Sequence, residues 1–390
     1  MTEVKLGRIQ SIDILKGLVM VLMALDHTRD YFHYDSFLFS PEDPIQSNIP
    51  MFFTRWITHF CAPAFSFLAG ISAFMISKRK AKKELSSFLI KRGLWLVFIE
   101  MTIVNFAWFF DVSFSNLGLL VIWVLGISMI ALAGLIWLPR RFILIFSCVL
   151  IFGHNLLDSI HFEGSLLWAI LHEFAFFDLG HGYKLMAVYP LIPWVAVMSL
   201  GYYFGEFYNV SFNANKRKRM FNNLGLASLA LFIALRFTNV YGNLISWKNY
   251  ENLSQDLISF FNPAKYPPSL TYLLMTLGFT FIFLANSEKL KSRLSDFFKV
   301  FGRVPFFYYI IHIYLIHVLA LLYSELSGFG WEKMVLKNWV TEDPLLKGYG
   351  LSLAFVYLVW IGVILFLYRI CKKFDKYKQN NKDKWWLSYL

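Results

Sequence analysis

Residues 12–33 read IDILKGLVMVLMALDHTRDYFH, and this stretch decides the fold class. A helix that crosses a bilayer needs about 20 mostly apolar residues, and this segment is long enough. Inside lipid the backbone must satisfy its own hydrogen bonds, so we expect a helix. Ionisable residues nevertheless stand near both ends, with Lys16 at one and Asp26 and His27 at the other. Because ionisable groups are costly in a membrane, each is a candidate functional residue.

The same apolar pattern recurs along the whole chain. Of the 390 residues, 57% are hydrophobic and only 16% are charged. A soluble domain could not bury so much apolar surface, and a disordered chain would hold far less of it. The composition predicts an all-α, polytopic transmembrane helix bundle of about ten spans. The expected spans are 12–33, 53–77, 88–110, 117–138, 142–157, 185–207, 220–238, 269–286, 300–323 and 350–371.

Basic residues indicate how the bundle is oriented. They gather between alternate spans, at 78–92, 140–141, 216–219 and 289–299, and again after residue 368. With ten spans every cluster faces the cytoplasm, as do both termini. We therefore interpret the net charge of +12 as a topology signal of a multi-pass inner-membrane protein, and not as a nucleic-acid-binding surface.

One apolar piece does not fit this count. Residues 164–178 are too few for an ordinary span and include charged side chains, so we expect an eleventh short or re-entrant helix on the outer side. Residues 1–375 are then one integral-membrane domain, and residues 376–390 form a basic cytoplasmic tail.

The first span presents two ionisable residues on one face. Lys16 and His27 are eleven residues apart, which brings the helix back to nearly the same angle after a rise of roughly 16 Å. That separation suits an extended acyl-pantetheine arm with its phosphates at Lys16. His27 can exchange a proton near neutral pH, which makes it a candidate catalytic base. Alternatively, Asp26, Arg29 and Asp30 pair with one another at the helix end, and His27 joins them.

The second span has two features of interest. His59 is expected in its outer half, either as a catalytic residue or as a partner in an interhelical hydrogen bond. Gly70, together with Ala69, Ser72 and Ala73, would let another helix approach closely.

Later spans supply further candidates. Tyr308 and His312 are four residues apart in the ninth span and would share a face. Arg303, at the inner start of that span, is expected to meet a donor phosphate or a lipid headgroup. Arg236, at the outer end of the seventh span, would hold an anionic group or extend to the interface.

Histidines also gather on the predicted outer side, in residues 153–184. They include His154, but they lack the paired spacing of a metal site, and the three cysteines lie far apart. We therefore expect no metal and interpret this region as a rim that recognises a polar acceptor.

Four stretches carry a family resemblance. Arg8–His27, Thr54–Gly70, Tyr189–Gly205 and Phe301–His317 resemble the bacterial members of the heparan-alpha-glucosaminide N-acetyltransferase catalytic-domain family. The first span is also similar to the wider membrane acyltransferase superfamily, including the acyltransferase-3 proteins that O-acylate surface sugars. Those begin Leu-Asp-x-Leu-Arg-Gly and place a functional His ten residues after the Gly. Asp13, Gly17 and His27 keep that register, and Tyr314-Leu-Ile-His317 resembles their late Tyr-Leu-x-His.

The chain departs from these families in two places. The acyltransferase-3 pattern has a functional Arg where this chain has Lys16, which keeps the charge but loses bidentate phosphate geometry. The lysosomal heparan enzymes have Asn at the position of His27 and take their catalytic His from the loop before the second span. In that loop this chain offers only His33, at a different spacing. The resemblance therefore implies an acyltransferase, but not heparan as its substrate.

These observations lead to one main hypothesis. The chain is expected to move an acyl group, with acetyl as the first candidate, from acyl-CoA at the cytoplasmic side to a sugar or glycoconjugate acceptor at the outer side. His27 would act as general base or acyl carrier, with Asp26 orienting it and His59 nearby. The expected donor-binding residues are Lys16 and Arg303. The residues expected along the passage or at the acceptor are Arg29, His33, Tyr308, His312, Arg236 and His154.

Two alternatives remain open at this point. The chain could be a transporter, in which prolines break helices around a midplane site and His and Asp residues relay protons. It could also be a membrane scaffold without chemistry, although that leaves the histidines unexplained.

Overall fold

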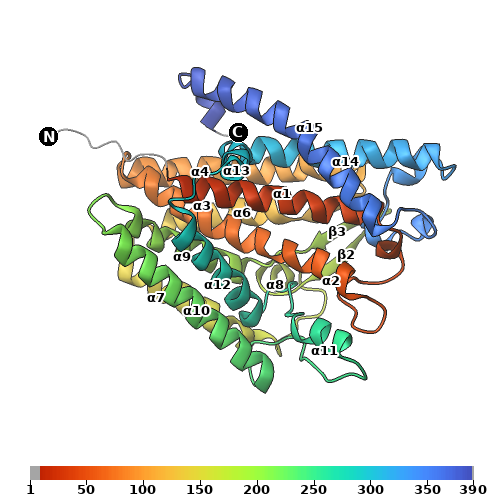
Figure 1. The fold of residues 1–390 in the computed structure, drawn as a ribbon, viewed down its shortest axis with the longest axis horizontal. Coiled ribbons are helices and arrows are strands. Elements are labelled where there is room, and N and C mark those ends of the chain that lie inside the picture. The colour runs from red at the N-terminus through yellow and green to blue at the C-terminus, as the bar shows by residue number, and fades with distance from the viewer. Residues whose placement is uncertain (1–8, 389–390) are drawn as a thin grey trace.

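Long helices make up most of the computed structural model, which describes residues 9–388 (Figure 1). Arg8, quoted above for the resemblance, and the last two residues of the predicted tail lie outside this range. The helices that correspond to predicted spans are α1 (Gln10–Phe32), α2 (Ile49–Trp56) with α3 (Cys61–Ser77), α4 (Lys82–Ile99) with α5 (Asn105–Phe109), α6 (Val121–Leu135), α7 (Arg140–Gly153), α9 (Leu191–Phe204), α10 (Ala214–Thr238), α12 (Leu270–Ser287), α14 (Pro305–Leu326) and α15 (Leu353–Asn380). The prediction of an all-α bundle is thereby confirmed.

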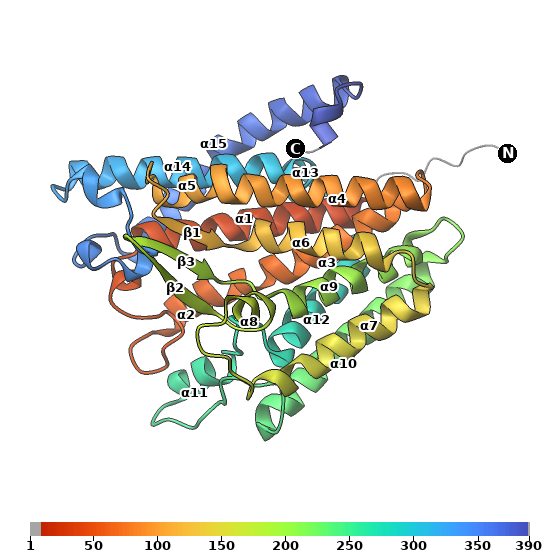
Figure 2. The ribbon, with the colours of Figure 1, turned by 180° about the vertical axis from the view of Figure 1, so that it is seen from behind.

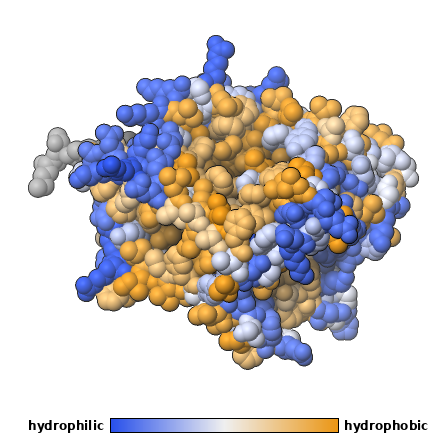
Figure 3. Space-filling model, turned by 60° about the horizontal axis from the view of Figure 1, so that its bottom comes forward, coloured by the Kyte–Doolittle hydropathy of each residue, from blue (hydrophilic) through white to orange (hydrophobic). Residues whose placement is uncertain are grey.

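Several of these helices are suited to a bilayer. Six helical segments are long and apolar enough to cross one, by length and composition. They are Ile49–Ser77, Arg140–Leu157, Ala214–Thr238, Leu270–Ser287, Pro305–Leu326 and Leu353–Asn380. Figure 3 shows hydrophobic side chains over the middle of one face of the molecule and hydrophilic ones around its edge. The chain is therefore a membrane protein.

A small sheet replaces part of the predicted helix at one end of the bundle (Figure 2). Strands β1 (Asn116–Leu119), β2 (Ala175–Gly180) and β3 (Tyr183–Ala187) lie in the order β1-β3-β2, with β1 parallel and β2 antiparallel to β3. Of the eleventh helix expected at 164–178, only the six-residue α8 (Leu166–Leu171) is present. The rest of this segment is not helical because the chain turns back at His181 and Gly182. Both residues have positive φ, which is typical of a tight hairpin.

The predicted ninth span is divided in two. The short helix α13 (Arg293–Arg303) ends before Val304, whose φ of −131° and ψ of 48° are not helical, and α14 starts at Pro305. Proline lacks an N–H and is well suited to the first turn of a helix, whereas the residue before it disfavours helical backbone. Arg303 therefore closes α13 and does not belong to the spanning helix.

Glycines let two pairs of helices touch at the backbone. A Cβ on Gly17 of α1 would lie 1.8 Å from the Phe298 carbonyl oxygen of α13, and one on Gly302 would lie 1.9 Å from the Asp13 oxygen. Gly70 of α3 makes the same kind of close contact with α9, because a Cβ on Gly70 would lie 1.9 Å from the Met198 carbonyl oxygen. The close approach predicted at Gly70 is therefore confirmed, and α1 and α13 are in direct backbone contact.

Gly302→Ala should destabilise the protein by about 3 kcal/mol or more, because the new methyl group meets backbone that cannot yield. The measurement is the unfolding temperature of purified protein in detergent. Gly362→Ala, in α15, is the matched control, since nothing lies within 4 Å of its Cβ position. Equal unfolding temperatures for Gly302→Ala and wild type would contradict the importance of this contact.

Candidate functional site

Two cavities lie end to end inside the bundle. The first, here called the histidine cavity, has a volume of about 420 Å³, and its lining includes His27, Asp26 and Arg55. The second, the basic cavity, has a volume of about 890 Å³, and its lining includes Lys16 and Arg92. Both cavities share four lining residues, which we call the junction: Met23, Phe65, Val121 and Tyr309. The molecule thus contains two chambers of different chemistry that adjoin at these four residues.

His27 forms a hydrogen-bonded pair with His312. The two come from α1 and α14, and Nδ1 of His27 lies 2.8 Å from Nε2 of His312. Their rings are stacked, with centroids 4.9 Å apart and an interplanar angle of 17°. Trp108 of α5 packs edge-on against His27 with a centroid separation of 4.7 Å. The partner of the His27 ring is therefore His312, and not Asp26 as the sequence suggested.

The hydrogen bonds of this pair determine which nitrogen of His27 is free. Nδ1 of His312 lies 3.1 Å from the carbonyl oxygen of Tyr308, to which it must donate. Nε2 of a neutral His312 is then an acceptor, and Nδ1 of His27 donates to it. Within residues 9–388, no hydrogen bond reaches Nε2 of His27, and its ring lines the histidine cavity. The arrangement leaves a basic nitrogen with a free lone pair facing the cavity.

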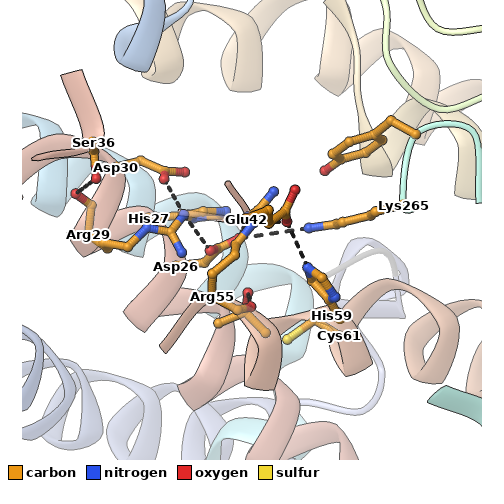
Figure 4. Close-up of polar contacts among 12 residues, drawn as sticks. Asp26, His27, Arg29, Asp30, Ser36, Glu42, Arg55, His59, Cys61 and Lys265 are labelled. Atoms are coloured by element: carbon orange, nitrogen blue, oxygen red, sulfur yellow. Dashed lines mark hydrogen bonds and ion pairs between the residues drawn. The ribbon is translucent and has the colours of Figure 1, made fainter. Parts of the chain in front are cut away.

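A chain of ion pairs forms one wall of the histidine cavity (Figure 4). The Asp26 carboxylate lies 2.5 Å from Arg55 Nη1 and 2.9 Å from Arg29 Nη2, and Asp30 lies 2.5 Å from the same Arg29 nitrogen. Lys265 Nζ, from a loop, is 3.9 Å from Asp26. The predicted pairing among Asp26, Arg29 and Asp30 is therefore confirmed. Opposite charges compensate one another here, as buried charges require.

Glu42 extends this wall from the loop before α2. Its Oε1 atom accepts hydrogen bonds from Arg55 Nε and from His59 Nε2, each at 3.0 Å. Burial alone would raise the pKa of Glu42, but the Arg55 charge and the His59 hydrogen bond outweigh it and hold that pKa well below its usual value. His59 is fully buried and does not line the cavity, so its place is in the supporting wall.

The basic cavity lies between α1, α3, α4 and α6. Arg79, Lys80, Arg92 and Lys16 bring four positive charges to its lining, whereas Asp13 is the one acidic residue there among those described. Lys16 Nζ donates to Ser72 Oγ of α3 at 2.8 Å. Because α1 is an unbroken helix, Lys16 and His27 lie on one face as predicted, one in each cavity.

Other predicted residues lie outside the two cavities. Arg303 is 3.3 Å from Asp375 of α15. Tyr308 lines neither cavity, although its ring stacks on His312 at a centroid distance of 5.0 Å. His33 is buried just beyond the end of α1. Its burial, and to a smaller extent the Arg29 charge, lowers the pKa of His33 to about 4.

Arg236 and His154 support loops. The buried Arg236 guanidinium donates to the carbonyl oxygens of Phe260, Ile245 and Ser259, and so ties the loop after α10 to that helix. His154 Nε2 donates to the Pro268 carbonyl oxygen at 2.8 Å. Among the residues described, no group of His, Cys, Asp or Glu could hold a metal ion.

Sequence reasoning assigned no role to several cavity residues. Arg79, Lys80 and Arg92 were used only as topology signals, although they line the basic cavity. Arg55 and Lys265 carried a usable signal, since each is a basic residue in a region otherwise poor in them. Trp108 and Tyr309 carried none, because aromatic residues are abundant throughout this chain.

The comparison with known families found a match. Residues 8–237 match the family described as heparan-alpha-glucosaminide N-acetyltransferase, catalytic. The match covers more than half of the chain and includes His27, the ion-pair wall up to Arg55 and the basic cavity residues of α3 and α4. It ends before Lys265, Tyr309 and His312. No curated protein matches the chain.

Glu42→Gln should lower the unfolding temperature at neutral pH, because it removes the negative charge that accepts hydrogen bonds from Arg55 and His59. A carboxyl whose pKa is depressed by folding contributes stability above its unfolded pKa, about 4.3, and loses that contribution as the pH falls below it.

The difference in unfolding temperature between wild type and Glu42→Gln should therefore be largest at pH 6 to 8 and shrink at acid pH. Glu163→Gln, at an exposed loop position, serves as control. A difference independent of pH would contradict the role of the charge.

Proposed function

The chain belongs to the heparan-alpha-glucosaminide N-acetyltransferase catalytic family, and from this premise we propose that it carries an acyl group across the membrane. The donor is acetyl-CoA or another acyl-CoA, bound from the cytoplasm of a cell whose inner membrane holds the protein. The acceptor is the hydroxyl or amine of a sugar or glycoconjugate at the outer side. The family assignment favours this membrane acyltransferase over the transporter that the sequence left open.

One observation supports the proposal above all: the two cavities meet at the junction. A donor with an anionic, phosphate-bearing head and a long thin arm matches a basic chamber that shares lining residues with a second chamber. Lys16, Arg79, Lys80 and Arg92 would hold the phosphates. The arm would run along the face of α1 that joins Lys16 to His27, and its thioester would arrive at the junction.

The second chamber suits the acceptor. Its lining combines ion-paired carboxylates with aromatic side chains, as sites for polar ligands with apolar faces do. The aromatic residues are Trp108, Phe174, Phe176, Tyr189, Tyr266 and Trp339. Phe174 and Phe176 belong to the segment of α8 and β2, so the region expected to be an outer rim does reach this cavity.

His27 would act as general base. Its free Nε2 takes the proton of the acceptor hydroxyl or amine, and the acceptor oxygen or nitrogen attacks the thioester carbonyl carbon. The C–S bond then breaks, and the imidazolium returns its proton to the sulfur, which leaves CoA with a free thiol. His312 keeps the imidazole in the required tautomer through its bond to Nδ1.

His27→Ala should abolish acyl transfer, because His27 is the one histidine among the described residues that lines the histidine cavity. The assay uses purified protein in detergent with radiolabelled acetyl-CoA, and it follows CoA thiol release and label on a panel of sugars. His161→Ala, a mostly exposed histidine paired with Glu173, is the control. Full transfer by His27→Ala would contradict the proposal. Label that binds to wild-type protein without acceptor, and not to His27→Ala, would indicate a covalent acyl-histidine intermediate instead.

Arg79→Gln with Arg92→Gln should raise the KM for acetyl-CoA by about tenfold or more and leave kcat nearly unchanged, because these residues bind the donor equally before and during the reaction. The effect should weaken as salt is added. Arg141→Gln, an exposed arginine at the start of α7 outside the basic cavity, is the control. An unchanged KM would remove the basic cavity from donor binding.

A further inference from the structure

A thioester at the junction would develop negative charge on its carbonyl oxygen, and that charge needs hydrogen-bond donors. Backbone N–H groups usually supply them, but within a helix these groups are already bonded to carbonyls. A helix N-terminus is the exception. The N-terminus of α6 does reach the junction at Val121, but Glu100 Oε2 already accepts from Ile122 N at 2.9 Å and Trp123 N at 3.0 Å. Side chains at the junction are therefore the candidates for these donors.

Two side-chain hydrogen-bond donors lie at this place. Trp108 is 4% exposed, and its indole nitrogen has no hydrogen-bond partner among the residues described. Its ring contacts His27 and lines the histidine cavity. Tyr309 is 2% exposed, lines both cavities and stands one turn before His312 on α14. A buried indole N–H normally finds a partner, so an unpaired one beside the catalytic base needs an explanation.

The two donors are also neighbours. The indole of Trp108 interacts with the hydroxyl of Tyr309, but the geometry is not that of a hydrogen bond. Another buried tryptophan, Trp194, also leaves its indole nitrogen unpaired, so an unpaired indole alone marks no site. Trp108 differs because it lies at a cavity wall, against His27 and beside a second donor.

We propose that the Trp108 indole N–H and the Tyr309 hydroxyl form the oxyanion hole of the acyl transfer, which makes both of them catalytic residues. The inference rests on the proposed function. As the acceptor attacks, the C=O π electrons move to the carbonyl oxygen, which accepts a hydrogen bond from each donor. When the tetrahedral intermediate collapses, the C=O bond forms again, the C–S bond breaks, and His27 protonates the sulfur. Neither donor loses its own proton.

Removing either donor should lower kcat while donor binding is preserved. Tyr309→Phe and Trp108→Phe keep an aromatic ring in place, and each should lower kcat on the order of 100-fold. The KM for acetyl-CoA should stay within about twofold, and acetyl-CoA should raise the unfolding temperature as it does in wild type. The double variant should lose less than the product of the two single effects, since both donors act on one oxygen.

Matched controls separate this role from packing. Tyr314→Phe removes a hydroxyl from the same helix, where it donates to Ile103 O and lines neither cavity. Trp194→Phe removes an equally buried and unpaired indole N–H away from both cavities. Both controls should keep wild-type kcat.

The outcomes distinguish the two proposals. If His27→Ala is inactive but Tyr309→Phe and Trp108→Phe keep wild-type kcat, the oxyanion hole is wrong and the proposed function stands. If kcat falls together with acetyl-CoA-dependent stabilisation, the two residues serve packing, and the inference is overturned. If wild type neither binds acetyl-CoA nor releases its thiol with any acceptor, the proposed function itself fails.

Discussion

The backbone contact between α1 and α13 is the constraint on which the rest of the site depends. Gly17 and Gly302 remove the side chains that would keep these helices apart, so each backbone rests on the other. Because α13 is joined to α14 at Val304 and Pro305, this contact also determines where α14 begins. His312 then lies beside His27 at the same depth, although 285 positions separate them in sequence.

Buried charge gives the site its second organising principle. Asp26, Asp30 and Glu42 face Arg29, Arg55 and Lys265, so each acid in this wall has a basic partner. Buried ion pairs contribute little net stability, but a single unpaired member would be costly, which keeps the set together. The side chains of this wall pair with one another, and none of them accepts a hydrogen bond from His27. The imidazole is thus left to pair with His312 alone.

The site could be predicted only in part, and the reason differs from residue to residue. His27 and Lys16 were recognisable because ionisable groups in an apolar helix stand out, and because helical geometry places positions eleven apart on one face. Arg303 was placed within a continuous span because the prediction did not use Pro305, which disfavours helical backbone at Val304. Arg236 looked like a ligand-binding residue, but the loop that folds over it supplies backbone carbonyls as its partners.

The sequence by itself determined that this is a helical membrane protein of the acyltransferase kind, and it placed the candidate catalytic residue His27 on the first helix. Hydropathy, charge distribution and helical periodicity are local properties, and lipid leaves the chain little choice of secondary structure. The tertiary structure decided the partner of His27, the two cavities and their junction, and the positions of Trp108 and Tyr309 beside them. Those features join residues from distant helices. Their contacts depend on the close packing of helix backbones, which a local sequence pattern does not predict.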